Sequence, residues 1–112
     1  MNKNEYEKIK SMTISHDDFM QEQLQDKEFQ YAWLKQKIED YIEDGDFYTF
    51  YRAIERVVKA RTTVTQLAKD LKMDRSNLSE ILNGKKEPKM QTTMKILKAL
   101  GYELTLSKRE IA

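Results

Sequence analysis

The sequence predicts an all-α fold with one short strand near the C-terminus, and three observations support this. Apolar residues recur at steps of three and four along most of the 112 residues, as they do on the buried face of a helix. Residues that commonly cap helix N-termini, such as Asp26, Asp46 and Asp74, stand directly before several of these stretches. Tyr102–Leu106 instead alternates apolar and polar residues, which is the period of a strand.

Two N-terminal helices are expected between residues 15 and 44. Ser15, with Asp18 three residues later, resembles a capping box, and the helix that it starts should end near Asp26. Asp26 can cap a second helix that runs through Asp44 and is stopped by Gly45. Residues 1–14 have no convincing helical period, and we expect them to be disordered.

A third helix is expected from the Asp46 cap to Arg61, with apolar residues at helical spacing throughout. The second and third helices hold most of the aromatic residues of the chain. Such rings could stack on single-stranded bases. We favour core packing, because most of them fall on buried helix positions and the segment is acidic. These residues are Phe29, Tyr31, Trp33, Tyr41, Phe47, Tyr48, Phe50 and Tyr51.

Two short helices follow back to back. Thr63 and Gln66 form a capping box for a helix that buries Leu67, Ala68 and Leu71. Asp74 caps the next helix, which buries Leu78, Ile81 and Leu82 and ends at Gly84. A last helix should span Met90–Leu100 and stop at Gly101.

Such a helix pair leaves the outer face of its second helix free, and that face is polar. A helix fits the major groove of B-DNA, where its first side chains can reach base edges. An ordinary solvated helix pair remains the alternative. As base contacts we predict Arg75, Ser76, Asn77, Ser79 and Glu80. As phosphate contacts we predict Thr65, Asn83, Lys85 and Lys86.

Charge divides the chain into two parts. Residues 1–46 hold 6 Lys and Arg against 12 Asp and Glu, a net charge of −6, whereas residues 47–112 hold 14 against 7, a net charge of +7. The basic part suits DNA and the acidic part suits a basic protein, although both could be solvated helix faces. We expect a disordered segment over residues 1–14, an acidic helical region over 15–45 and a DNA-binding domain with the strand over 46–107.

Other chemistries have little support in the sequence. There is no cysteine, and His16 is the only histidine, so no zinc cluster or Cys–His pair can form. Asp40–Tyr51 lacks carboxylates at the third and twelfth positions of a calcium loop. No signal peptide or run of eighteen apolar residues is present. We therefore expect a soluble cytoplasmic protein with no catalytic residue, no metal, no cofactor and no membrane partner.

Residues 63–100 resemble the Xre/Cro-like helix-turn-helix family, whose fold is lambda-repressor-like. The matching elements are TVTQLA, DLKM, DRSNLSEILNG, KKEP and KILKALG, in the family's order and spacing. The chain departs from the family pattern at three positions. Val64 replaces a phosphate-contacting Gln, Lys72 replaces the turn Gly, and Leu82 replaces a Glu before the closing Gly. The second change asks a residue other than glycine to accept the turn, at some strain.

Residues 17–106 also look like the HigA-type addiction-module antidote branch. Leu24–Phe29, Asp44–Asp46 and the ending KALGYELTL carry this likeness. The resemblance implies a cytosolic dimeric antitoxin that binds a RelE/HigB-like ribonuclease toxin and represses its own operon. A stand-alone Xre-type regulator is the alternative. A protein-interaction module with a vestigial helix-turn-helix is a third reading, because Glu80 is an acid on the DNA face. We expect the toxin to contact Ser15–Tyr41.

The predicted strand bears on the oligomeric state. A lone strand leaves its backbone N–H and C=O groups without partners. The simplest partner is the same segment of a second copy, which makes Tyr102, Leu104 and Leu106 the predicted dimer contacts. The strand could instead fold back on its own domain or pair with a strand of the toxin.

Overall fold

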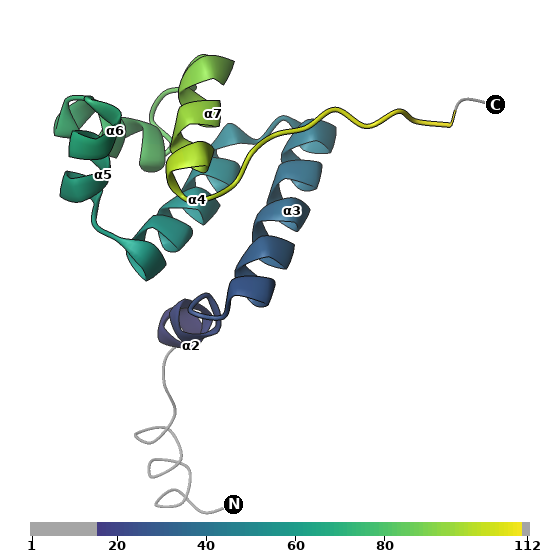
Figure 1. Ribbon diagram of the computed structural model, residues 1–112, viewed down its shortest axis with the longest axis horizontal. Helices are drawn as coiled ribbons and strands as arrows, with labels where there is room; N and C mark the ends of the chain where they lie inside the picture. Colours follow the sequence, from purple (N-terminus) through teal and green to yellow (C-terminus); the bar gives the residue numbers. More distant parts are fainter. Residues whose placement is uncertain (1–15, 111–112) are drawn as a thin grey trace, which may run out of the picture.

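The computed structural model describes residues 16–110 and forms six helices over them (Figure 1). In order these are α2 (His16–Gln23), α3 (Lys27–Asp44), α4 (Phe47–Arg61), α5 (Val64–Leu71), α6 (Arg75–Leu82) and α7 (Met90–Ala99). Each agrees with an expected helix to within a few residues. The all-α class is therefore confirmed, and the arrangement is compatible with a helix-turn-helix-like fold.

The predicted N-terminal caps form. Asp26 accepts a hydrogen bond from the Phe29 amide at 2.9 Å, and Asp46 accepts one from the Thr49 amide at 3.1 Å. Thr63 and Asp74 do the same at the starts of α5 and α6, at 3.1 and 3.0 Å. Each bond satisfies one of the amides that a helix start leaves without a partner. The expected cap at Ser15 lies outside the described residues.

Helix α4 is the centre of the core. It packs against α2, α3, α5 and α6, and seven of its fifteen residues are buried. Of the aromatic residues expected in the core, Phe50 and Tyr51 are buried. Phe29, Trp33, Tyr41 and Phe47 pack against the core while partly exposed. Tyr31 and Tyr48 are exposed, so the expectation holds for most of the cluster but not for these two.

The side chain of Gln30 joins four parts of the chain in the interior. Its Nε2 donates to the carbonyl of Leu24 at 2.9 Å, at the end of α2. Its Oε1 accepts from Arg61 at 3.0 Å and from the Tyr102 hydroxyl at 2.8 Å. Gln30 is buried, so leaving its amide without these partners would cost about 1–3 kcal/mol. The network ties α3 to the end of α4 and to the segment after α7.

The prediction of a strand at Tyr102–Leu106 is wrong for the single chain, because residues 16–110 contain no strand. Residues 102–110 leave the end of α7 as an extended segment (Figure 1). The physical reason is the lack of a ladder partner. The neighbouring backbone belongs to helices, whose N–H and C=O groups are already bonded within the helix. The alternation of side chains is present, but the pairing is not.

Two glycines allow a matched stability test. Gly45 and Gly84 both have φ of 71°, where a side chain is strained. A Cβ at Gly45 would meet nothing within 4 Å, whereas one at Gly84 would lie 2.5 Å from Cδ2 and 3.0 Å from Cα of Tyr48. We expect Gly45→Ala to cost about 1 kcal/mol of unfolding free energy and Gly84→Ala about 2–4 kcal/mol, since strain and overpacking add there.

Urea unfolding of both variants measures these costs. Equal losses of unfolding free energy for Gly45→Ala and Gly84→Ala would show that the close approach of Tyr48 adds no cost to a side chain at position 84.

Candidate nucleic-acid interface

Helices α5 and α6 are joined by three residues, Lys72, Met73 and Asp74. Lys72 has φ 56° and ψ 42°, which is the left-handed conformation, so it accepts the turn in place of a glycine as expected. Its amide and that of Met73 donate to carbonyls in the last turn of α5. The inner faces of the two helices are buried, through Leu67, Ala68, Leu78, Ile81 and Leu82. The outer face of α6 is left to solvent.

The predicted base-contacting residues differ in exposure. Arg75, Ser76 and Glu80 are exposed, whereas Asn77 and Ser79 are half-buried. The Nε of Arg75 donates to Thr65 Oγ1 at 2.7 Å, which links the start of α6 to the start of α5. This bond uses one edge of the guanidinium and leaves both terminal nitrogens for another acceptor. Thr65 itself is exposed beside it.

Asn83 is held within the protein. Its Oδ1 accepts from Arg52 Nη1 at 2.9 Å, and its Nδ2 donates to Ser79 Oγ at 3.3 Å. Both ends of the amide are therefore engaged without a ligand. The bonds fix the end of α6 against α4, so the side chain that sequence reasoning assigned to a phosphate also has a structural role.

Arg52 and Glu55 were missed by the sequence analysis. Arg52 Nη1 lies 2.9 Å from Glu55 Oε1, and Lys59 Nζ lies 3.3 Å from the same oxygen. Glu55 is buried, four residues after Tyr51 and three before Val58. A carboxylate on the apolar stripe of a helix needs a charged partner, and Arg52 and Lys59 stand at the spacings that supply one. An acidic residue on the apolar stripe, with basic residues three positions before it and four after it, could therefore have indicated these ion pairs from the sequence.

The loop after α6 exposes both of its predicted phosphate contacts. Lys86 Nζ lies 3.5 Å from Glu80 Oε2, with both side chains about half exposed, so the pair is worth at most about 1 kcal/mol. Lys85 forms no ion pair within residues 16–110. The Glu80 acid, which counted against DNA binding, is thus offset locally by Lys86.

Two of the three departures from the family pattern are explained by burial. Leu82 is completely buried, so its position belongs to the core and not to the surface. Val64 is half-buried and packs against the core at the start of α5. A valine offers no donor to a phosphate, and here it contributes apolar contact.

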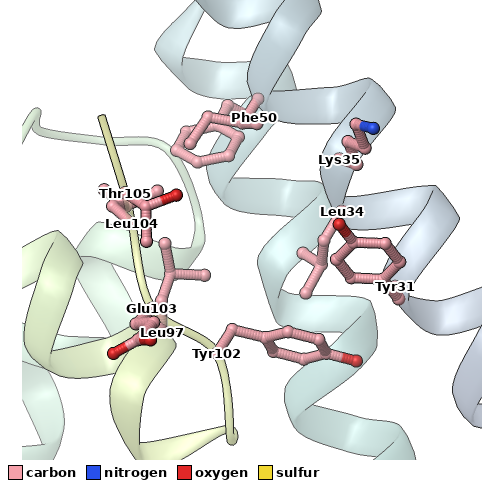
Figure 2. A pocket seen from close by; sticks show the side chains of 10 residues that line it. Tyr31, Leu34, Lys35, Phe50, Leu97, Tyr102, Glu103, Leu104 and Thr105 are labelled. Carbon is pink, nitrogen blue, oxygen red and sulfur yellow. The ribbon is translucent and has the colours of Figure 1, made fainter. Parts of the chain in front are cut away.

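Two of the predicted dimer contacts, Tyr102 and Leu104, line a hollow between α3 and the C-terminal segment, shown in Figure 2. The hollow measures about 250 Å³. Tyr102 is half-buried, and its ring stacks on Tyr31 with centroids 6.4 Å apart. Leu104 lines the hollow and is 43% exposed, whereas Leu106 is 99% exposed. Burial raises the pKa of Tyr102 above its ordinary value.

Next to this hollow, a hydrogen bond joins α3 to the loop before α7. The Tyr41 hydroxyl donates a hydrogen bond to Glu87. This bond, with a smaller contribution from burial, raises the pKa of Tyr41 to about 12. The Tyr41 ring stacks on Phe50 with centroids 4.8 Å apart. The loop with Lys85 and Lys86 is therefore tied to the end of α3.

A family model described as "Probable addiction module antidote protein" matches residues 14–108, which is most of the chain. The chain belongs to this antidote family. Family membership supports an antitoxin role and a toxin partner, and it suggests a regulatory protein without enzymatic activity. No curated protein and no solved structure matches the chain.

Two further findings concern residues 16–110. None of their helices has both the length and the apolar character needed to cross a membrane. No group of three or more His, Cys, Asp or Glu side chains in this part of the antidote protein could hold a metal ion.

The left-handed turn of the antidote protein provides a stability test. Lys72→Gly removes a backbone strain of about 1–2 kcal/mol from the folded protein. Glycine also raises the entropy of the unfolded chain, which opposes folding by about 0.4–1 kcal/mol. We therefore expect a net stabilisation of about 0.5–1 kcal/mol. Lys72→Ala keeps the Cβ and should change stability little. Urea midpoints at unchanged slope measure both effects. A less stable Lys72→Gly protein would show that the lysine side chain stabilises the turn more than its backbone strains it.

Proposed function

We propose that this antidote protein is the DNA-binding antitoxin of a type II toxin–antitoxin module, of the HigA type within the Xre/Cro-like helix-turn-helix proteins. It acts in the cytoplasm as a homodimer. It represses its own operon and neutralises a RelE/HigB-like ribonuclease toxin. The observation that carries the DNA-binding part is the outer face of α6, where Arg75 and Ser76 stand exposed on a helix whose inner face is fully buried.

Charge supports a division of labour between the two parts of the chain. The basic residues 47–112 suit the DNA backbone, and the acidic residues 1–46 suit a basic ribonuclease. We propose that residues 46–107 form the DNA-binding unit and that the toxin contacts Ser15–Tyr41, within the acidic region over residues 15–45.

The half-buried residues of α6 have a narrower role in this proposal. Ser79 is bonded to Asn83, and Asn83 to Arg52, so these side chains set the orientation of α6 as well as facing DNA. Arg75 is the principal candidate for base recognition, since its terminal nitrogens can donate two hydrogen bonds to a guanine edge. Glu80 can accept from cytosine N4.

The DNA assignment is tested by two single-cation variants on DNA from upstream of the antitoxin's own gene. Arg75→Ala should cost about 1–3 kcal/mol on the operator and little on random DNA. Lys85→Ala should weaken binding to both and reduce the salt slope by about one. Fluorescence anisotropy over a salt series measures both. Equal losses on operator and random DNA for Arg75→Ala would reduce Arg75 to a phosphate contact.

The homodimer is proposed to form by antiparallel pairing of the segment around Tyr102–Leu106. Residues 103–110 have no backbone hydrogen bonds within residues 16–110, and Leu106 packs on nothing there. A two-fold dimer would also present two copies of α6 to half-sites about 34 Å apart.

Leu106→Asp tests this dimer without disturbing the monomer, because Leu106 is almost fully exposed in the single chain. We expect the dimer dissociation constant to rise at least about tenfold, since a carboxylate would enter an apolar contact. Ser107→Asp adds the same charge one residue on, where the side chain faces the other way, and should stay dimeric. Sedimentation of both proteins decides. A Leu106→Asp protein as dimeric as the parent would exclude this contact.

A further inference from the structure

A second hollow, of about 390 Å³, lies between the end of α3 and the start of α7. On α3 it is lined by Ile38, Tyr41 and Ile42, and on the other side by Glu87, Pro88 and Met90. It shares Ile38, Phe50, Leu104 and Thr105 with the hollow of Figure 2. The two hollows are therefore parts of one groove along α3. We call the part between Ile42 and Met90 the α3–α7 groove.

The rim of the α3–α7 groove carries two large apolar side chains that contribute little to the stability of the fold. Ile42 is 76% exposed and Met90 is 75% exposed, so neither contributes much to the core. Two large apolar side chains on opposite rims of one hollow are the pattern of a protein-binding site, where an apolar anchor is placed between them.

Carboxylates flank this apolar pair on the α3 side. Glu39 lies one turn before Ile42 and Glu43 directly after it, and both are exposed. Neither forms an ion pair within residues 16–110. The last turn of α3 also holds no basic residue. Negative charge at a helix C-terminus opposes the helix dipole, so this pattern does not serve the stability of α3.

We propose that the α3–α7 groove is the docking site for the toxin, which inserts an apolar side chain between Ile42 and Met90 and sets Lys or Arg residues against Glu39 and Glu43. The inference rests on the proposed antitoxin function and names the surface that carries it. It moves the centre of the toxin contact from the middle of residues 15–41 to the C-terminal end of α3.

The charges of the rim favour this occupant over two others. DNA is repelled by the exposed carboxylates of α3, so the α3 side of the rim does not suit a nucleic acid. A second copy docked through the same groove would bring its own Glu39 and Glu43 against these residues across a two-fold axis, and like charges would meet. A basic protein relieves the repulsion between Glu39 and Glu43, which are four residues apart on one helix.

The test uses the full chain and the purified small basic protein encoded by the reading frame next to its gene. Ile42→Lys should weaken binding of that protein at least about 30-fold, as expected for the loss of an anchor contact. Ala99→Lys is the matched control, with the same charge change on an exposed position of α7, about 14 Å along the helix from Met90 and outside residues 15–45. It should bind within about threefold of wild type. Titration calorimetry measures both.

Glu39→Lys with Glu43→Lys tests the charged part of the same site. The double variant should slow association about tenfold or more and weaken its salt dependence, because the flanking charges steer the encounter. Operator binding by each variant, at the wild-type affinity, verifies that the fold is intact.

The remaining outcomes separate the two levels of the proposal. If the wild-type chain does not bind the neighbouring protein, the antitoxin function fails and the groove assignment fails with it. If the wild-type chain and Ile42→Lys bind it equally well, the function stands and the groove assignment is wrong. If Ile42→Lys turns a dimeric chain into a monomer, the groove is occupied by a second copy, which also overturns the assignment.

Discussion

Burial of α4 is the constraint on which the other features depend. Its apolar stripe is completely covered, with Ile54, Val57 and Val58 at zero exposure. Four helices pack against it, so α4 is shared between the acidic N-terminal helices α2 and α3 and the pair α5 and α6. Three of these helices are short, since α2, α5 and α6 have only eight residues each. Helices of that length are unstable alone, and their geometry comes from packing against α4.

Hydrophobic burial is non-directional, so polar contacts at the edges of the core set the orientations. Arg52 bonds Glu55 within α4 and reaches Asn83 at the end of α6. Gln30 joins α3 to Arg61 and Tyr102. The bonds from Arg52 to Asn83 and from Arg61 to Gln30 join different helices, so they oppose rotation of one helix against another. Helices α3 and α6 are therefore fixed relative to one another through α4, by the bonds of Gln30 to Arg61 and of Asn83 to Arg52.

The sequence predicted what local chemistry determines. Asp26, Asp46 and Thr63 each cap the helix that was expected to follow, because capping depends on residues within three positions. The strain at Lys72 was also predictable, since the family pattern shows where a left-handed residue is needed. These predictions required no knowledge of tertiary contacts.

The features that could not be predicted from the sequence depend on contacts between residues that are far apart along the chain. Residues 102–106 have the alternation of a strand, but a strand exists only where another backbone pairs with it, and residues 16–110 offer none. The link from Asn83 to Arg52 spans 31 residues, so nothing near Asn83 indicates it. The groove between Ile42 and Met90 likewise needs both helices in place.

The bond between Tyr41 and Glu87 connects the two proposed binding surfaces. Tyr41 lines the α3–α7 groove, while Glu87 follows Lys85 and Lys86 in the loop proposed to grip DNA. A partner in the groove that keeps Tyr41 against Glu87 holds the loop in one place, and a partner that displaces Tyr41 releases it. If the partner changes how firmly Tyr41 holds Glu87, the loop has a different free energy with and without the partner, and the proposed affinities for toxin and DNA are linked. By thermodynamic necessity the change in DNA affinity caused by the toxin equals the change in toxin affinity caused by DNA. Under the proposed function, autorepression and neutralisation would then respond to one another through a single side-chain contact.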